Sequence, residues 1–411
     1  MPTDVVPKSA SAATLVAIVC GAQIFVQLGA GFWPALMPEM MHRWSLTNSE
    51  AGWISAIFAA AYMCAVPVLV TLTDRMDAKR VYLFGVGCTF AGHLLFGLSA
   101  TGFWSALALR ALTGLGWAGT YMTGLKLLAD KVDAKLMSRA VTGHAASIGI
   151  SGALSYVLGD FIAEHLGWQA TFYVAALSAA IAWLAVALAV PGVQPAAAKA
   201  GALFDFRPVF RNRSAMAYAT AYCIHTLEMG ALRGWGVTFL AYIAATSGEE
   251  PWFGPTAVVT TLGLIGTTAS VLGNEAAIRF GRRNLVVAAM GLSIAMAILL
   301  AAVGTRFYEL TVVLLLIYGL IVWLDSSSLT AGAAGTAEPA RRGATLAGQS
   351  MLGYAGGFIG PLAVGWTLDL GGGMSAFSWG LSYLLIAALM LAALIAFIVI
   401  RPRELTGEGR N

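Results

Sequence analysis

The sequence predicts an all-α membrane protein whose twelve transmembrane helices form two six-helix halves. Three observations lead to this prediction. Of the 411 residues, 59% are hydrophobic and 11% are charged, whereas a soluble domain carries about 25% charged residues. Twelve apolar runs approach or exceed the length of about 20 residues that a bilayer span needs. Six runs lie on each side of one polar interruption, and the two sets share short motifs at a nearly constant offset.

The individual spans are the apolar runs between charged residues or clusters of Gly, Pro and Asn. In chain order they are 14–37, 50–73, 81–100, 104–128, 139–163, 168–190, 214–246, 255–277, 284–304, 308–330, 342–366 and 376–400. The interruption contains an alanine run followed by a basic stretch with phenylalanines, a composition that suits a membrane surface. We therefore expect an N-terminal bundle over 1–190, a cytoplasmic linker over 191–213, and a C-terminal bundle with a cytoplasmic tail over 214–411.

The positions of the basic residues orient the spans, because short cytoplasmic loops carry most of the Lys and Arg residues. With the N-terminus inside, 20 of the 24 basic residues fall in inner segments. Two, Arg43 and Arg306, fall in outer loops, and two, Arg110 and Arg233, lie within spans. This distribution predicts that both termini are cytoplasmic.

Other features of the composition exclude several classes of protein. The four cysteines are scattered singly, so the sequence indicates no disulfide framework, no metal site and no cofactor. The basic residues lie in short loops rather than on one face, so nucleic acid is not an expected partner. The first apolar run lacks a small-residue cleavage pattern and should remain in the mature protein. We expect a functional monomer in a cell membrane, the bacterial inner membrane being the expected location, whose partners are lipid, protons and a small-molecule substrate.

The two halves contain three pairs of similar segments in the same order. The loop at 74–79 corresponds to 278–283 at an offset of 204, and the start of the fifth span, 139–147, corresponds to 342–350 at an offset of 203. The segment 167–172 before the sixth span matches 372–377 at an offset of 205. Three matches at nearly one offset support a duplicated six-span unit, which is a common design of transporters.

These motifs resemble the major facilitator superfamily of secondary transporters over essentially the whole chain. The superfamily's loop signature is partly present as Asp74, Arg75, Lys79 and Arg80, and in the second copy as Arg279, Gly281, Arg282 and Arg283. Ile278 stands at the acidic position of that second copy. The fourth-span signature, an Arg followed by Gly at the fourth and sixth positions after it, is intact from Arg110 to Gly116. The resemblance implies the superfamily's fold, a central cavity lined by spans 1, 4, 7 and 10, and a gating role for Asp74, Arg75, Arg279 and Arg282.

Four charged residues fall within spans, where each charge costs roughly 2.5–3.5 kcal/mol on insertion scales. They are Arg110, Glu228, Arg233 and Asp325. Arg110 keeps its proton, so it needs an acidic partner, backbone carbonyls or an anionic ligand; the alternative is that it only ties its span to a neighbour. A low-dielectric site favours the neutral carboxylic acid, which makes Glu228 the best candidate for a carboxylate that couples transport to protons. The alternative for Glu228 is a static buried ion pair.

The seventh span combines polar residues with three glycines, Gly230, Gly234 and Gly236. Glycine weakens a helix, so we expect a local break that exposes backbone to a cavity. His225 and Glu228 are three residues apart and share a helix face. Glu228 and Arg233 are five apart, so they pair only if the glycines distort the helix.

Asp325 lies in the tenth span beside Trp323 and a run of three serines, at an offset of 205 from Thr120 in the fourth span. Both halves are therefore expected to place polar groups at the same depth. Further candidates for contact with the substrate are Gln27, Tyr121, His144, Gln349 and Tyr354. Hydrogen bonding between helices is the alternative role for each of these.

Two buried charges of each sign allow a cavity that is neutral when empty, and an entering anion would then require one carboxylate to take up a proton. The sequence thus favours a proton-coupled symporter for a small anionic metabolite, which works by rocking of two halves. A proton-coupled exporter of drugs or metabolites is the alternative. Internal neutralisation of Arg110 and Arg233 would instead suit a neutral or zwitterionic solute. A membrane enzyme or receptor is disfavoured, because no nucleophile, base or metal-ligand cluster is present in the sequence.

Overall fold

The computed structural model describes residues 11–73, 75–129, 132, 134–193, 207–248, 251–338, 341–405 and 408–409. This part of the chain is helical, with no β-strand. Its helices are α1 (Ala12–Gln27), α2 (Phe32–Trp44), α3 (Asn48–Leu72), α4 (Ala78–Ser99), α5 (Phe103–Ala118), α6 (Tyr121–Ala129), α7 (Ala134–Leu166), α8 (Trp168–Ala189), α9 (Arg207–Arg211), α10 (Arg213–Ser247), α11 (Pro255–Phe280), α12 (Arg282–Val303), α13 (Tyr308–Leu324), α14 (Ser326–Thr336), α15 (Arg342–Leu370) and α16 (Ala376–Ile400).

Ten helical stretches in the described residues are long and apolar enough to cross a membrane. They coincide with ten of the expected spans. The two others are also helical: 104–128 corresponds to α5 and α6, and 214–246 corresponds to α10. They are less apolar, because 104–128 contains Arg110 and 214–246 contains Glu228 and Arg233. The number of twelve membrane spans therefore stays a prediction.

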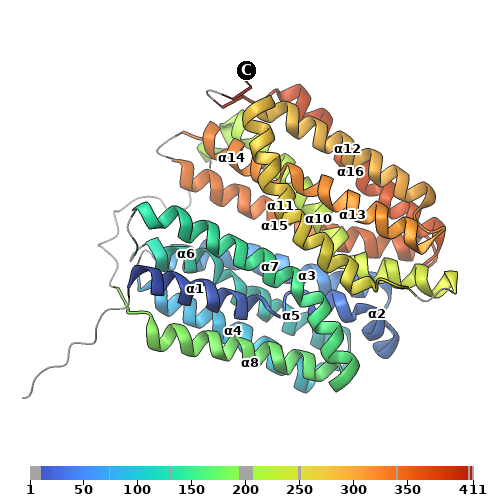
Figure 1. Ribbon diagram of the computed structural model, residues 1–411, viewed down its shortest axis with the longest axis horizontal. Coiled ribbons are helices and arrows are strands. Elements are labelled where there is room, and N and C mark those ends of the chain that lie inside the picture. Colours follow the sequence, from blue (N-terminus) through green and yellow to red (C-terminus); the bar gives the residue numbers. More distant parts are fainter. Residues whose placement is uncertain are drawn as a thin grey trace, which may run out of the picture.

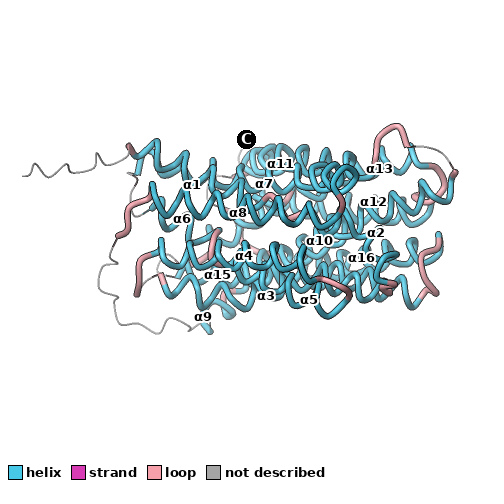
Figure 2. The backbone as a smooth tube through the Cα atoms, turned by 90° about the horizontal axis from the view of Figure 1, so that it is seen from below, coloured by secondary structure: helices cyan, strands magenta, loops and turns pink. Residues whose placement is uncertain are grey.

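The helices run side by side along the long axis of the molecule, with loops gathered at its two ends (Figure 2). Helices α1–α8 lie together in the lower part of Figure 1, and α10–α16 lie in the upper part. We call the end near Ala12 and Ile400 the terminal end and the opposite one, which holds the turns at 45–47 and 371–375, the distal end. The domain boundaries at 190 and 213 stay a prediction, since residues 194–206 lie outside the described residues.

Local sequence signals explain where several helices begin. Thr47 and Glu50 form a capping box at α3, in which the N–H of Glu50 donates to Thr47 Oγ1 at 3.1 Å and the N–H of Thr47 donates to Glu50 Oε2 at 2.9 Å. Asp77 caps α4 by accepting from the N–H of Lys79 at 2.9 Å. Pro255 opens α11, where its missing N–H has no helical partner to lose.

Three expected spans are interrupted rather than continuous, which corrects the predictions for 14–37, 104–128 and 308–330. The first span breaks at 28–31, the fourth at 119–120 and the tenth at Asp325. The last two breaks lie 205 or 206 positions apart, so the sequence repeat is also visible as a repeated break in the backbone. Hydroxyl groups of neighbouring helices satisfy the first break: Ser151 Oγ donates to the carbonyl of Ile24 at 2.7 Å and Ser178 Oγ to that of Phe25 at 2.6 Å.

The predicted break in the seventh span is wrong, because α10 runs without interruption from Arg213 to Ser247. Its glycines serve close packing instead. A Cβ atom at Gly230 would lie 3.2 Å from Gly357 of α15, and one at Gly234 would lie 3.2 Å from the ring of Pro361. Because Gly230 and Gly234 have no side chain, α10 and α15 can approach closely while the helical hydrogen bonds of α10 stay intact.

The two groups of helices are joined most firmly towards the distal end, where α3 packs on α15 and α7 on α11. Asp369 of α15 accepts hydrogen bonds from the backbone N–H groups of Asn48 at 3.2 Å and Ser49 at 2.7 Å, and from the Asn48 side chain at 2.7 Å. Asp160 of α7 accepts from the hydroxyl of Thr256 at 2.7 Å. At the terminal end, the main contacts of α6 stay within α1–α7 and those of α14 within α10–α15.

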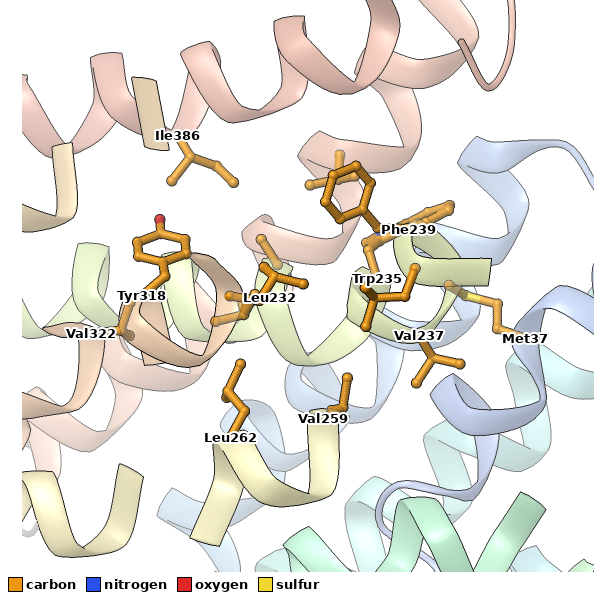
Figure 3. Packing of buried hydrophobic residues seen from close by; sticks show 14 of the residues in the cluster. Met37, Leu232, Trp235, Val237, Phe239, Val259, Leu262, Tyr318, Val322 and Ile386 are labelled. Atoms are coloured by element: carbon orange, nitrogen blue, oxygen red, sulfur yellow. The ribbon is translucent and has the colours of Figure 1, made fainter. Parts of the chain in front are cut away.

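The largest apolar core also crosses between the groups. Figure 3 shows Met37 of α2 beside Val237 of α10, with Trp235 and Phe239 on the same helix. All four side chains are buried. This core fastens α2 to α10 near the distal end, so the polar groups described next lie on helices whose positions are well supported.

Candidate functional site

Glu228 lies inside the C-terminal group of helices, where Tyr318 is its hydrogen-bond partner. The hydroxyl of Tyr318 on α13 donates to Glu228 Oε1 at 2.5 Å, and both side chains are buried. A cavity of about 20 Å³ adjoins the pair and is lined also by aromatic residues such as Trp235 and Tyr383 (Figure 3 shows Trp235 and Tyr318). A volume of this size holds about one water molecule. The carboxyl group therefore has a hydroxyl partner and a small, mainly apolar space next to it.

His225 and Asp325 form a second buried contact, between α10 and the break that separates α13 from α14. His225 Nδ1 lies 2.9 Å from Asp325 Oδ1, and both side chains are at most 4% exposed. The distance is that of an ion pair, yet neither atom makes an aligned hydrogen bond within the described residues. Asp325 does not cap α14 with its side chain either. The close approach of these two buried groups therefore links α10 to the break between α13 and α14.

Arg110 is buried in α5 without a carboxylate partner among the described residues. Its side chain is 4% exposed, and its Nε and one terminal nitrogen make no hydrogen bond there. The guanidinium carbon lies 4.9 Å from the centre of the Phe58 ring, a cation–π contact. An aromatic ring offsets part of the cost of burying the charge but leaves the hydrogen-bonding capacity of the guanidinium group free.

Arg233 does not pair with Glu228, so the ion pair that the sequence left open is absent. The helix stays regular and directs the two side chains to different neighbours. The guanidinium group of Arg233 lies against Gly152 of α7, where a Cβ atom would be 3.2 Å away. Tyr156, one turn further along α7, donates its hydroxyl to the Arg233 carbonyl at 2.9 Å. Arg233 therefore lies at the contact between the two groups of helices and, within the described chain, pairs with no carboxylate.

Each group of helices also contributes a tyrosine stacked on a histidine. The rings of Tyr121 and His144 lie 5.8 Å apart at 8°, and His144 Nε2 lies 3.1 Å from the Tyr121 carbonyl oxygen. The rings of Tyr222 and His225 lie 5.6 Å apart at 20°. Tyr121 and His144 belong to the N-terminal group of helices and Tyr222 and His225 to the C-terminal group, so each group carries one such pair.

Tyr354 stacks on Tyr62 across the groups, with ring centroids 3.6 Å apart and an interplanar angle of 21°. The other predicted polar candidates are buried with unused hydrogen-bonding atoms. Both amide atoms of Gln27, the Oε1 of Gln349 and the Nε1 of Trp323 have no partner in the described chain, whereas Gln349 Nε2 donates to Thr330 at 3.1 Å. Buried polar atoms are nearly always paired, so the unpaired atoms of Gln27, Gln349 and Trp323 keep these side chains candidates for contact with a polar solute.

Comparison with known families agrees with this arrangement. A sequence profile described as the Major Facilitator Superfamily matches residues 18–266, more than half of the chain. The chain belongs to the major facilitator superfamily. It is thus a multi-pass membrane protein and a transporter rather than an enzyme, as the sequence predicts.

Similar members of the superfamily extend over most of the chain. An uncharacterized MFS-type transporter of Bacillus subtilis, YbcL, is 26% identical over 329 residues, which cover 78% of this chain and 80% of YbcL. Human protein spinster homolog 1 is 25% identical over 294 residues, which cover 66% of this chain and 54% of that protein. The crystal structure of a bacterial homolog of the lysosomal transporter spinster, in an inward-facing and occupied conformation, aligns with a TM-score of 0.76 at 13% identity. That alignment covers 95% of this chain and 96% of the other, and it shows the shared superfamily fold.

The residues of the superfamily's loop signature differ in their surroundings. Asp74 lies outside the described residues. Arg75 and Arg279 are exposed, whereas Arg282 is 2% exposed and fully engaged in hydrogen bonds. At the offset of 204, Arg75 and Arg279 are counterparts and both are exposed, whereas the buried Arg282 corresponds to Ala78 in the first copy.

Several residues of the site escaped the sequence analysis. Tyr318 lies seven residues before Asp325, a spacing of two helical turns that places both on one face and could have indicated it. Tyr62, Tyr156 and Tyr222 carried no comparable signal, because tyrosine is common in apolar spans and these contacts depend on how the two groups of helices meet.

Proposed function

We propose that this chain is a proton-coupled symporter, which moves a small anionic metabolite across the membrane by alternating access. The pairing of the buried charges carries the proposal. Glu228 and Asp325 are partnered by Tyr318 and His225 within one group of helices. Arg110 and Arg233 pair with no carboxylate in the described chain. Internal neutralisation of the two arginines would suit a neutral or zwitterionic solute instead, and this arrangement of the buried charges argues against it.

The two arginines also lie on opposite sides of one contact. Arg110 is on α5 and Arg233 on α10, and Tyr156 of α7 donates its hydroxyl to the backbone carbonyl of Arg233. An anion between them would touch both groups of helices at once. Such a ligand stabilises the conformation in which the arginines approach each other, which is the energetic requirement for a substrate that drives a conformational change.

Glu228 is the proton carrier in this mechanism. A buried carboxyl group beside Tyr318 and a water-sized space can accept and release a proton without leaving the helix bundle. The non-aligned contact of His225 with Asp325 then supplies a second group of charges that can rearrange when α14 moves.

The distribution of contacts supports alternating access. The groups of helices are fastened by Asp369 and Asp160 towards the distal end, while α6 and α14 have their main contacts within their own group at the terminal end. With cytoplasmic termini, as the basic residues predict, the terminal end faces the cytoplasm. This conformation would then be the one that opens inward.

Transport by purified protein in proteoliposomes tests the proposal. A radiolabelled panel of mono- and dicarboxylates, inorganic anions, sugars and amino acids is offered with and without an inward proton gradient. We expect a carboxylate or inorganic anion to accumulate only with the gradient. Glu228→Gln should lose accumulation but retain exchange of the labelled solute, whereas Glu309→Gln, an exposed carboxylate at the start of α13, should behave as the unchanged protein.

Full accumulation by Glu228→Gln would contradict its role as proton carrier. The alternative function is a proton-coupled exporter. In that case protons would move in the direction opposite to the solute. Efflux of solute accompanied by proton entry into the compartment that the solute leaves would establish antiport instead.

A further inference from the structure

The segment after α16 lies against the terminal end of the C-terminal helices. The N–H of Arg403 donates to Ser214 Oγ at 3.1 Å, and the hydroxyl of Tyr218 donates to the Arg403 carbonyl at 3.2 Å, which ties the segment to α10. Six residues later, the N–H of Gly409 donates to the carbonyl of Ile278 on α11 at 3.1 Å. The described positions of this segment, 401–405 and 408–409, thus follow the surface of the bundle.

Two carboxylates of the segment meet the start of α12. Glu404 Oε1 accepts from the backbone N–H of Arg283 at 3.0 Å. Glu408 accepts from Arg282 through both oxygens, at 3.1 Å from Nε and at a shorter distance from a terminal nitrogen. The Arg282 side chain is 2% exposed and that of Glu408 is 9% exposed. A bidentate pair shielded from water is among the strongest and most directional polar contacts in proteins.

The remaining terminal nitrogen of Arg282 reaches the broken tenth span. It donates to Asn274 Oδ1 on α11 at 3.1 Å and to the carbonyl of Ser328 on α14 at 2.9 Å. Ser328 lies in the first turn of α14, three residues after Asp325. One guanidinium group therefore connects the C-terminal segment to the half-helix that begins at Asp325.

The sequence repeat explains why this connection exists in the second half. The first loop has the acidic residue Asp74, but its counterpart position holds Ile278, which cannot pair with an arginine. Glu408 brings a carboxylate to the same loop from elsewhere in the chain, and the adjacent Gly409 bonds to the backbone of Ile278 itself.

We propose that the C-terminal segment is an intramolecular brace, in which Glu408 replaces the acidic residue missing at position 278 and, through Arg282, positions α14 and the Asp325 contact. Glu408 and Arg282 are positioning residues in this arrangement, since they act on the site through α14. The effect on the conformation of α14 does not depend on which solute the protein transports.

Hydrogen–deuterium exchange of the full-length protein in lipid nanodiscs tests the brace. Glu408→Gln keeps an acceptor but removes the charge, and we expect amides of 326–336 to exchange about tenfold faster, the effect of losing one strong charge-assisted contact. The counterpart half-helix, 121–129, should be unchanged. Glu338→Gln is the matched control, because it removes an exposed ion pair with Arg341 on the same end of the molecule.

Arg282→Lys tests whether the geometry of the Arg282 contacts, and not only the positive charge, positions α14. Lysine keeps the charge but cannot bond to Glu408, Asn274 and Ser328 in the fork geometry of a guanidinium group. We expect it to loosen 326–336 as Glu408→Gln does, and a chain ending after Leu405 to do the same. Unchanged exchange of 326–336 in Glu408→Gln and in the shortened chain would overturn the proposal. A uniform increase over all helices from α10 to α16 would overturn it too, because it would show general destabilisation rather than positioning of α14.

Discussion

Asp369, in the last turn of α15, caps the first turn of α3 by accepting a 2.7 Å hydrogen bond from the backbone N–H of Ser49. A carboxylate is favoured at a helix N-terminus because it meets unpaired N–H groups and the positive end of the helix dipole. Asp160 makes the corresponding contact from α7, with Thr256 in the first turn of α11. Each group of helices therefore sends one carboxylate to the start of a helix in the other.

Replacement of Asp369 with Asn should weaken the closure of the distal end. Hydrogen bonds to a charged group contribute about 1.5–3 kcal/mol each, so loss of the charge should raise the population of molecules open at this end by about tenfold. The measurement is the rate of maleimide labelling of Phe358→Cys, which faces Trp53 across the two groups, in a variant without the four native cysteines.

Glu39→Gln is the control for this experiment. It removes a carboxylate that pairs with Arg43 on the exposed end of α2, close to the distal end and within one helix. Its labelling rate should equal that of the parent, since exposed ion pairs contribute little. Equal labelling rates in Asp369→Asn and the parent would show that the cap does not hold the groups together.

Thr256→Val should act in the same direction as Asp369→Asn but more weakly, because it removes one hydroxyl donor and keeps the side-chain shape. We expect an increase of about threefold in the labelling of Phe358→Cys, as for a hydrogen bond of about 0.5–1.5 kcal/mol. The two contacts share no residue, so the free-energy effects in the double variant should add. A double variant that labels no faster than Asp369→Asn would indicate that the contacts do not act on the same opening.

Tyr318→Phe should destabilise the protein by about 1–3 kcal/mol, because it removes the hydroxyl group that donates to the buried Glu228 carboxyl group. Thermal unfolding in detergent measures the effect. Combining the change with Glu228→Gln should be non-additive, as for two residues in contact. Tyr383→Phe, which lines the same cavity without a hydrogen bond to Glu228 in the described chain, should leave the unfolding temperature nearly unchanged.

Gly356→Ala should destabilise the protein by about 1–3 kcal/mol through overpacking, because the new methyl group would collide with the backbone carbonyl of Cys223 on α10. Gly21→Ala on α1 is the matched control. A Cβ atom there meets nothing within 4 Å, and alanine favours helix by about 1 kcal/mol over glycine. The unfolding temperature should therefore fall for the first variant and stay or rise for the second.

The hydrophobic pattern predicted most helices and most of their boundaries within a few residues, since bilayer spans depend mainly on length and apolar composition. The predicted ends at 37 and 330 fall short of Trp44 and Thr336 by seven and six residues. It also indicated Glu228 and Asp325, because a charge in an apolar run is conspicuous. The sequence was a poorer guide to breaks. Glycines in α10 suggested one, but whether a glycine bends a helix or admits a neighbour depends on what packs against it, here Gly357 and Pro361.

The partners of the charged residues could not be predicted from the sequence either, because they lie on other helices. Helix spacing relates Glu228 to His225 and Arg233, yet its actual partner is Tyr318, 90 residues away. The same holds for Glu408 and Arg282, 126 residues apart. Spacing rules describe one helix at a time, whereas these contacts arise only when several helices are assembled.

The unbroken course of α10 has a mechanical consequence. At 1.5 Å per residue its 35 residues extend for about 52 Å, well beyond a hydrocarbon core of about 30 Å. A single stiff rod of this length acts as a lever: a tilt imposed where α10 contacts α2 of the opposite group reappears, reversed in direction, where Ser214 meets the C-terminal segment. The three interrupted spans can absorb a displacement locally, but the continuous helix α10 transmits it from one end of the molecule to the other.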